Sequence, residues 1–394
     1  MRIKHQCVVT IAVTIVLLTT ASTYLRADTG TCGGASITLP FTDVPSTNIF
    51  FCSIAEAYLS GLTNGFTSTT YNPSGNVPRE QMAAFVTRTM DQSLRRGSRR
   101  AALDQFWNAN VQVHGPVVGS GPRLVKSDGA DLWVAIFADN TIVRVRASDG
   151  QRIGTWTGAT NAYGVVVAGG YVYVTGRTNP GILYIIDPSA VPGAAGVVSS
   201  TLGVNPAGIA YDGNNIWTAN SASGPGTGSV SIFSLVTFTP TTVSTGFSQP
   251  LGILYDGAFI WITDTGDGTL KKLDESGSIM QTVVVGSNPQ FPAFDGTNIW
   301  VPNIGNDTVT VVRASTGAVL ATLSGNGLNS PRSVAFDGER FLVTNSVSSV
   351  SIWKATDLSV IGAFSLGGQI PFAACSDGLN FWITNSGGGT IMRF

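Results

Sequence analysis

The sequence predicts a mainly β protein, a seven-bladed β-propeller preceded by a small α-hairpin domain. Three observations support this prediction. An Asp-Gly step recurs every 39 to 44 residues, an aromatic residue follows most steps at a fixed distance, and a Pro precedes most of them. A unit of about 42 residues has room for four short strands, which make one blade. The seven steps begin at Asp128, Ala168 (a degenerate copy), Asp212, Asp256, Asp295, Asp337 and Asp377.

The first strand of each unit begins six residues before the step, at a Pro in every unit except the second, because the strand entry needs no backbone donor. Small and bulky residues then alternate, which is typical of innermost strands around a propeller axis. The residue directly after each opening position is expected at the mouth of the central channel. There, Arg123, Gln290 and Arg332 are candidate ligand-binding residues, and the two arginines flank the last blade, so they could converge on an anion. The alternative is that these side chains are merely solvated at the rim.

Five units place a Trp five residues after the turn Asp, which predicts packing between blades. A second shared position, eight after the Asp, carries polar residues that we expect to cap the next loop. The alternative for that set is a cation or sugar site at one rim. The Trp residues are Trp133, Trp217, Trp261, Trp300 and Trp382, and the polar residues are Asn220, Asp264, Asn303, Asn345 and Asn385.

The last unit ends at Phe394 after its third strand, so its outer strand is missing. Residues 110–114 read as a strand, and we expect them to close the ring beside the last blade, which would leave no free edge. The repeats YVTG or WxxN, followed by NDTVTVVRASTGAVLATL, resemble the YVTN/NHL-like seven-bladed propellers over residues 110–394. This resemblance implies a fold and no single activity.

The N-terminal region has the composition of an exported protein. Residues 1–27 combine a basic start with a short apolar run, which predicts a cleaved signal peptide; an uncleaved anchor is the alternative. In an oxidising compartment Cys32 and Cys52 are expected to form a disulfide, whereas Cys375 is expected to pack in a core. Charged residues are only 11% and the net charge is −1, so nothing indicates nucleic acid or an anionic membrane surface as a partner.

Residues 28–90 form the predicted helical domain, and 91–109 a basic linker. A first helix is expected to bury Phe51, Ile54, Ala55, Tyr58 and Leu59, which fall on one face. A second helix is expected to present an apolar stripe of Met82, Phe85, Val86 and Met90.

The segments FTDVP, GLTNG, YNP and VPREQMAAF resemble, in that order, one S-layer homology motif. The resemblance implies binding of cell-wall polysaccharide or peptidoglycan, and it assigns that role to Asp43, Arg79 and Gln81. In the family a Thr-Arg-Ala-Glu segment begins the second helix; here Pro78, Glu80 and Gln81 surround the matching Arg79. An Arg at a helix N-terminus suits an anionic sugar. The alternative is that Arg79 is a solvated helix residue and Asp43 a turn former.

We therefore expect a secreted cell-surface protein without catalytic activity, metal or cofactor, whose propeller recognises a ligand or protein partner. The enzyme alternative is a lyase or lactonase, similar to streptogramin lyases or gluconolactonases. Such chemistry needs general bases or metal ligands, and the chain has only two His, His5 and His114, while Glu275 and Glu339 fall in expected turns. Neither a CxxC nor an HExxH motif occurs.

Overall fold

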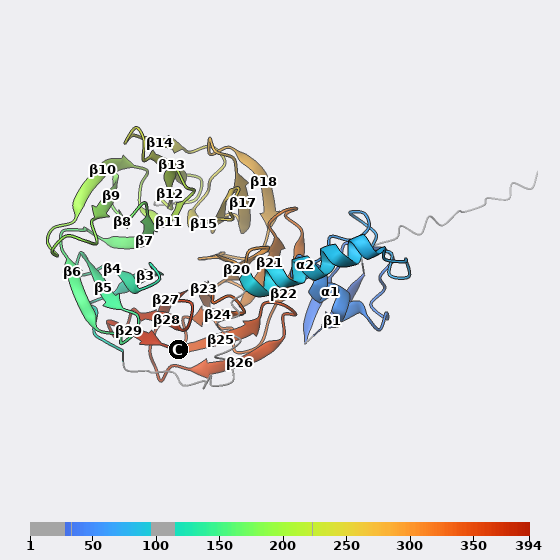
Figure 1. The fold of residues 1–394 in the computed structure, drawn as a ribbon. Helices are drawn as coiled ribbons and strands as arrows, with labels where there is room; N and C mark the ends of the chain where they lie inside the picture. Colours follow the sequence, from blue (N-terminus) through green and yellow to red (C-terminus); the bar gives the residue numbers. More distant parts are fainter. Residues whose placement is uncertain (1–27, 33, 96–114, 223) are drawn as a thin grey trace, which may run out of the picture.

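The computed structural model describes residues 28–32, 34–95, 115–222 and 224–394. These residues form seven β-sheets arranged in a ring, with a smaller module at its side (Figure 1). The architecture is a seven-bladed β-propeller, as the repeats predicted. The predicted signal peptide, most of the predicted linker and the predicted closing strand 110–114, with His114, lie outside the described residues.

Each of the first four blades has four antiparallel strands in chain order, innermost first. Their bounds are β3 Pro122–Ser127, β4 Asp131–Ile136, β5 Thr141–Arg146 and β6 Arg152–Trp156; β7 Ala162–Ala168, β8 Tyr171–Gly176, β9 Gly181–Ile186 and β10 Gly196–Leu202; β11 Pro206–Tyr211, β12 Asn215–Asn220, β13 Ser229–Ser234 and β14 Pro240–Val243; β15 Pro250–Tyr255, β16 Ile260–Asp264, β17 Thr269–Leu273 and β18 Ile279–Val284.

The remaining three sheets differ in strand number, because the fifth gains two strands from the N-terminal module and the seventh has only three named strands. Their bounds are β19 Ala293–Phe294, β20 Asn298–Asn303, β21 Thr308–Arg313 and β22 Val319–Leu323; β23 Pro331–Phe336, β24 Arg340–Asn345, β25 Ser349–Lys354 and β26 Val360–Ser365; β27 Pro371–Ser376, β28 Phe381–Asn385 and β29 Thr390–Arg393.

The ring closes where the last blade meets the first. Residues 116–118, just after the predicted closing strand, run antiparallel beside β29: the Val118 amide donates to Gly389 (2.8 Å) and the Ile391 amide to Pro116 (3.2 Å). The Thr384 hydroxyl also donates to the Arg123 carbonyl of the first blade at 2.8 Å. The threonines at the same position of the second, fourth and sixth blades bond to the next blade in the same way, so this junction resembles the others.

The turn aspartates make the repeated interaction that holds each inner hairpin. One carboxylate oxygen accepts amides of the turn, and the other accepts the indole N–H of the Trp five residues later. The indole distances are 2.8 Å for Trp133, 2.6 Å for Trp217, 2.7 Å for Trp261, 3.3 Å for Trp300 and 2.7 Å for Trp382. All five rings are buried, which confirms that they pack in the protein interior.

Two blades lack the Trp, and other residues form their turns. In the sixth blade Leu342 takes the Trp position, and the Arg340 Nε donates to the Asp337 carboxylate at 3.0 Å. In the second blade Ala168 and Gly169 replace the Asp-Gly step, and Gly169 and the following Gly170 both adopt positive φ, so the backbone turns without a carboxylate.

The hydrogen bond from the Trp217 indole affects the pKa of the Asp212 carboxyl. Burial alone would raise the pKa of Asp212, but hydrogen bonds from the Trp217 indole and from the amides of Asn214 and Asn215 outweigh burial, so its pKa is lowered. A pKa that is lowered in the folded state stabilises the fold at neutral pH. That contribution is lost as the pH falls through the lowered pKa.

We predict that Trp217→Phe lowers the free energy of unfolding at neutral pH by about 1.5–3 kcal/mol, because it removes a hydrogen bond to a charged group. Urea denaturation measures this loss. The deficit should shrink as the pH falls from the ordinary Asp value of 3.8 through the lowered pKa of folded Asp212, because below that lowered pKa the carboxylate is protonated in both states.

The matched control is Trp353→Phe, which trims a ring that is 1% exposed. Within the described chain the Trp353 indole donates no hydrogen bond, so its deficit should not depend on pH in this range. Equal pH dependence in the two variants would contradict the role assigned to the indole.

The N-terminal module contains β1 Thr29–Cys32, β2 Ala35–Thr38, α1 Phe51–Leu59 and α2 Arg79–Arg95. The sequence prediction missed the two strands. The predicted disulfide between Cys32 and Cys52 is present. Strand β2 pairs with β22 at Ile37 and Ala321, so the module extends the fifth blade outward (Figure 1).

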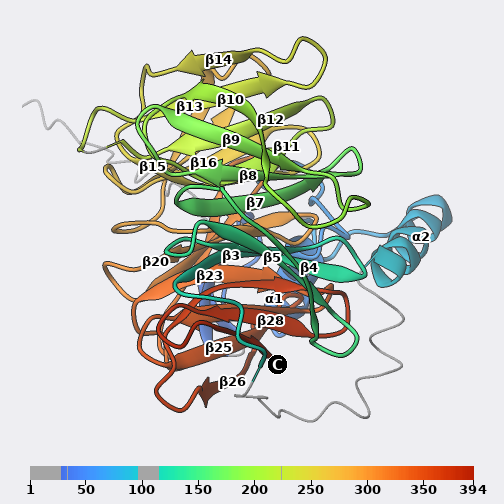
Figure 2. The same cartoon turned by 90° about the vertical axis from the view of Figure 1, so that its left-hand side faces the viewer.

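The two helices differ in how well their apolar faces were predicted. All five residues of the α1 stripe are buried, as expected. The predicted α2 stripe is wrong as a core face: Met82 and Val86 are 52% and 61% exposed, and Phe85 is only half-buried. The reason is that α2 projects away from the ring (Figure 2), so the described part of the chain leaves Met82 and Val86 uncovered.

Candidate binding surfaces

The N-terminal module shares its core with the propeller. Leu39, Phe41 and Leu59 are fully buried in the same hydrophobic cluster as Leu320 and Leu323 of the fifth blade. Burial of such side chains contributes about 1.5–3 kcal/mol each. The module is therefore held against the propeller by a continuous apolar core.

Polar contacts fix the end of α1 on the same blade. The Asn298 side-chain amide donates to the Leu59 carbonyl at 2.8 Å, and the Arg313 guanidinium donates to the carbonyls of Leu59 and Tyr58. The Arg313 guanidinium also lies 4.1 Å from the centre of the Tyr58 ring. The free carbonyls at a helix C-terminus need donors, and here blade residues provide them.

The three residues that the S-layer resemblance singled out lie in this module. The Asp43 carboxylate accepts the amides of Tyr71 (2.8 Å) and Asn72 (2.7 Å), so it holds the loop that leads toward α2. Arg79 is the first residue of α2, and both Arg79 and Gln81 are exposed. Within the described residues, Arg79 has no hydrogen bond or ion pair with Asp43 or any other side chain.

Arg123 and Arg332 meet at one mouth of the propeller channel, as their position after the opening Pro predicted. Their guanidinium groups lie 4.6 and 4.8 Å from the centre of the same Phe372 ring. Arg177, which the sequence prediction missed, lies 5.0 Å from the centre of the Tyr163 ring. We call Arg123, Arg177 and Arg332 the arginine face.

The arginine face lies over a layer of aromatic rings. Tyr163, Phe291 and Phe372 come from the second, fifth and seventh blades, and their ring centres are 5.9 to 6.3 Å apart. We call these three residues the aromatic plug, because they meet across the channel. Gln290 is only 5% exposed, and its amide donates to the Asn288 side chain at 2.7 Å, so it lies beneath the surface.

The electrostatics of the arginine face follow from burial and like charge. Desolvation lowers the pKa of Arg123 and of Arg332, with Tyr163 acting in the opposite direction and a neighbouring arginine adding to the lowering. The Nε atom of Arg123 is buried without a hydrogen-bond partner. An anion placed here would relieve the repulsion between the guanidinium groups.

The polar residues eight after each turn Asp serve the fold. All five are fully buried. The Asn303 side chain, for example, donates to the hydroxyls of Thr308 (3.1 Å) and Thr310 (2.9 Å) on the next strand. In the 264–267 loop the Lys271 ammonium lies 2.6 Å from both the Asp264 and the Asp267 carboxylates, at the place where a cation would sit.

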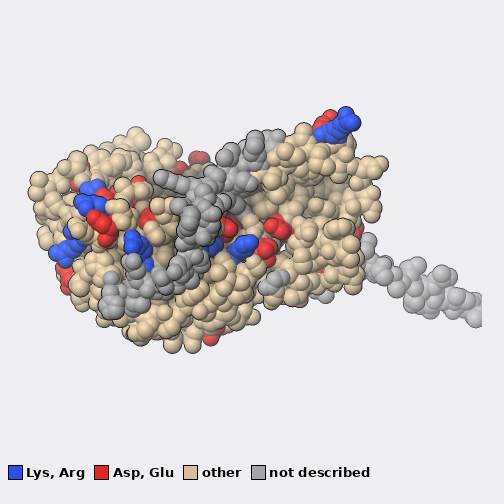
Figure 3. Space-filling view, turned by 60° about the horizontal axis from the view of Figure 1, so that its bottom comes forward, with Lys and Arg blue, Asp and Glu red and all other residues tan. Residues whose placement is uncertain are grey.

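Charge is sparse elsewhere. Figure 3 shows acidic and basic side chains scattered over a largely uncharged surface. Among the described residues, no group of three or more His, Cys, Asp or Glu side chains is arranged to hold a metal ion. No helix in the described part of the chain is long and apolar enough to span a membrane.

Comparison with known proteins supports the division into a module and a propeller. Residues 40–83 match the S-layer homology domain, which confirms that resemblance and implies attachment at the cell surface. A comparison with curated protein sequences found no match.

Solved structures share the propeller fold at low identity. The hydrazine synthase of Kuenenia stuttgartiensis has a TM-score of 0.59 at 16% identity, covering 73% of this chain and 98% of that one. The WD40 propeller domain of Doa1 has a TM-score of 0.58 at 12% identity, and the match covers 70% of this chain and 92% of that one. The computationally designed Ika8 protein has a TM-score of 0.54 at 13% identity, and the match covers 69% of this chain and 83% of that one. At these identities the similarity concerns the fold alone.

We predict that Arg313→Met loosens the module from the fifth blade, because two carbonyls at the end of α1 lose their charged donor. A loss of about 1.5–3 kcal/mol would speed hydrogen exchange of the α1 amides roughly 10- to 100-fold. Exchange in the first three blades should not change. Arg146→Met is the matched control, since Arg146 forms an exposed pair with Asp149. Unchanged α1 exchange in Arg313→Met would contradict this docking.

Proposed function

We propose that this protein is exported and attaches to a cell-wall polymer through its N-terminal module, while the propeller serves as a non-catalytic recognition or scaffold module. The observation that carries the proposal is the S-layer homology match at residues 40–83. The wall-binding role assigned to Arg79 and Gln81 rests on the resemblance and on their exposure at the start of α2.

The start of α2 offers chemistry suited to an anionic polymer. A guanidinium group can bind a carboxylate with two parallel hydrogen bonds, and the first amides of a helix lack intrahelical partners. Asp43 contributes indirectly, because its two amide hydrogen bonds hold the loop before α2. We therefore assign Asp43 a positioning role and Arg79 the contact with the polymer.

One motif offers a single point of contact, so we expect weak attachment by an isolated chain. Several chains on one polymer would bind more tightly through multivalency. Because the module shares its core with the fifth blade, binding should be measured on the whole mature chain and not on the isolated module.

We predict that Arg79→Ala weakens co-sedimentation of the mature chain with purified cell-wall sacculi about tenfold or more, because the charged contact to the polymer is lost. Arg152→Ala is the control, since Arg152 is an exposed arginine on the propeller. Equal binding by wild type and Arg79→Ala would refute the assignment of Arg79. Failure of the wild type to bind sacculi would refute the wall-binding function.

For the propeller, we propose that the arginine face recognises an anionic group of a wall fragment or protein partner. Three guanidinium groups lie together over the aromatic plug, and no carboxylate ion pair to Arg123, Arg177 or Arg332 occurs within the described residues. Sites of this kind favour carboxylate or phosphate ligands.

We predict that Arg123→Ala/Arg332→Ala lowers the affinity for anionic wall fragments about tenfold or more, in a salt-dependent way. Isothermal titration calorimetry with solubilised fragments measures the change. Arg146→Ala/Arg152→Ala removes the same charge from the first blade and should bind like wild type. Equal loss in both double variants would mean that only net charge matters.

A further inference from the structure

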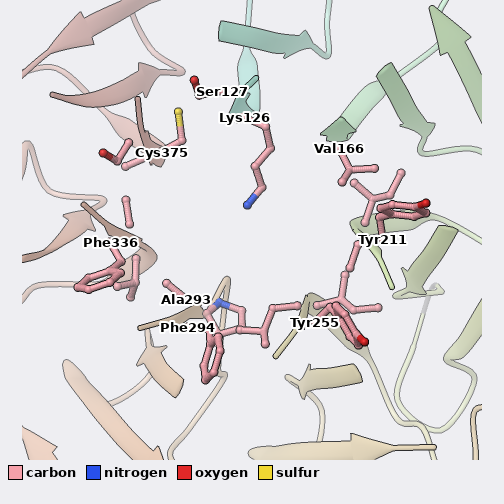
Figure 4. A pocket seen from close by; sticks show the side chains of 18 residues that line it. Lys126, Ser127, Val166, Tyr211, Tyr255, Ala293, Phe294, Phe336 and Cys375 are labelled. Atoms are coloured by element: carbon pink, nitrogen blue, oxygen red, sulfur yellow. The ribbon is translucent and has the colours of Figure 1, made fainter. Parts of the chain in front are cut away.

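A cavity of about 450 Å³ lies in the propeller channel, at the opposite end from the arginine face. It is lined by the last residues of all seven innermost strands, close to the Asp-Gly turns (Figure 4). The aromatic plug separates it from the arginine face, since its three rings contact one another across the channel. The cavity is therefore a separate space.

One basic residue interrupts an otherwise uncharged ring in this cavity. The fifth residue of each innermost segment stands opposite the Trp position of the second strand. In the first blade this residue is Lys126, and its amino group points into the middle of the cavity (Figure 4). In the other blades it is Val166, Ala210, Leu254, Ala293, Ala335 and Cys375.

Lys126 has no counter-ion in the cavity. Within the described residues its amino group has neither a hydrogen bond nor an ion pair. The other titratable groups on the wall are Cys375, Tyr211 and Tyr255. Burial raises the pKa of the Cys375 thiol to about 12, so the thiol is neutral at physiological pH. The two tyrosine hydroxyls donate to carbonyls of their own turns, Tyr211 to Gly213 and Tyr255 to Gly257.

The aspartates of the nearby turns do not supply the missing charge either. The Asp128 carboxylate accepts the Trp133 indole and turn amides, and the Asp377 carboxylate accepts the Trp382 indole and turn amides in the same way. The Lys126 side chain reaches into the channel, where the surrounding blades enclose it but leave it in contact with water. The resulting partial loss of hydration lowers the pKa of Lys126, because it disfavours the charged form.

We propose that the channel cavity binds a small organic monocarboxylate, whose carboxylate pairs with the Lys126 ammonium and whose apolar part lies against the wall. Ile209, Ile253 and Val334 supply aliphatic surface, and Phe294 and Phe336 supply rings. The volume falls within the range of about 300–1,000 Å³ that is typical of small-molecule sites. One basic group beside aliphatic and aromatic side chains suits a ligand that has a single carboxylate and an apolar part.

The test is isothermal titration of the mature chain with octanoate and with octanamide, which differ in charge but hardly in shape. We expect octanoate to bind wild type on the order of 10- to 100-fold more tightly than octanamide. Lys126→Met should reduce octanoate to the level of octanamide, and Lys126→Arg should keep the preference. Octanoate binding should weaken as the pH rises through the pKa of Lys126.

Two further measurements make the test decisive. Arg123→Ala/Arg332→Ala should bind octanoate like wild type, which separates this site from the arginine face. In wild type, octanoate should slow acylation of Lys126 by an amine-reactive reagent, read by mass spectrometry, so the test does not depend on folding of a variant. The proposal is overturned if wild type does not bind octanoate, if Lys126→Met binds it equally well, or if Lys126 is not protected.

Discussion

The hydrogen bond between a turn carboxylate and an indole is the constraint on which the propeller depends. In five blades one Asp oxygen holds the turn amides while the other holds the Trp of the adjacent strand. The pair thus fixes the turn and the register of the innermost hairpin together. Each hairpin then places its first strand on the channel wall. In the sixth blade a guanidinium takes the place of the indole, because the Arg340 Nε donates to the Asp337 carboxylate.

Periodic local chemistry explains why the fold was predictable from sequence. The spacing of Asp, Trp and Pro follows from the turn and strand geometry within one blade. Seven repeats of that unit predict seven blades arranged in a ring. The proximity of Arg123 and Arg332 was predictable for the same reason, since both follow an opening Pro. Arg177 was missed because it lies beyond the end of a second strand, outside the repeat position that was considered.

The placement of the N-terminal module could not be predicted in this way. Its contacts with the fifth blade join residues more than two hundred positions apart, such as Leu59 with Asn298 and Tyr58 with Arg313. No local sequence pattern predicts contacts between residues so far apart in the chain. The prediction that the apolar stripe of α2 is a core face was wrong because the pattern does not show what packs against that face. An amphipathic pattern indicates that an apolar face exists, but Met82 and Val86 stay exposed because none of the residues that the structure describes covers them.

The shared core of module and propeller restricts how the propeller is oriented relative to the N-terminal module. A module on a free linker would let the propeller turn in any direction relative to its attachment point. Here β2 extends the fifth blade and α1 is bound to it by Asn298 and Arg313, while α2 points away from the ring (Figure 2). If this module makes the attachment, its shared core with the fifth blade restricts how the propeller axis turns relative to the surface. The arginine face and the channel cavity would then face two defined and opposite directions.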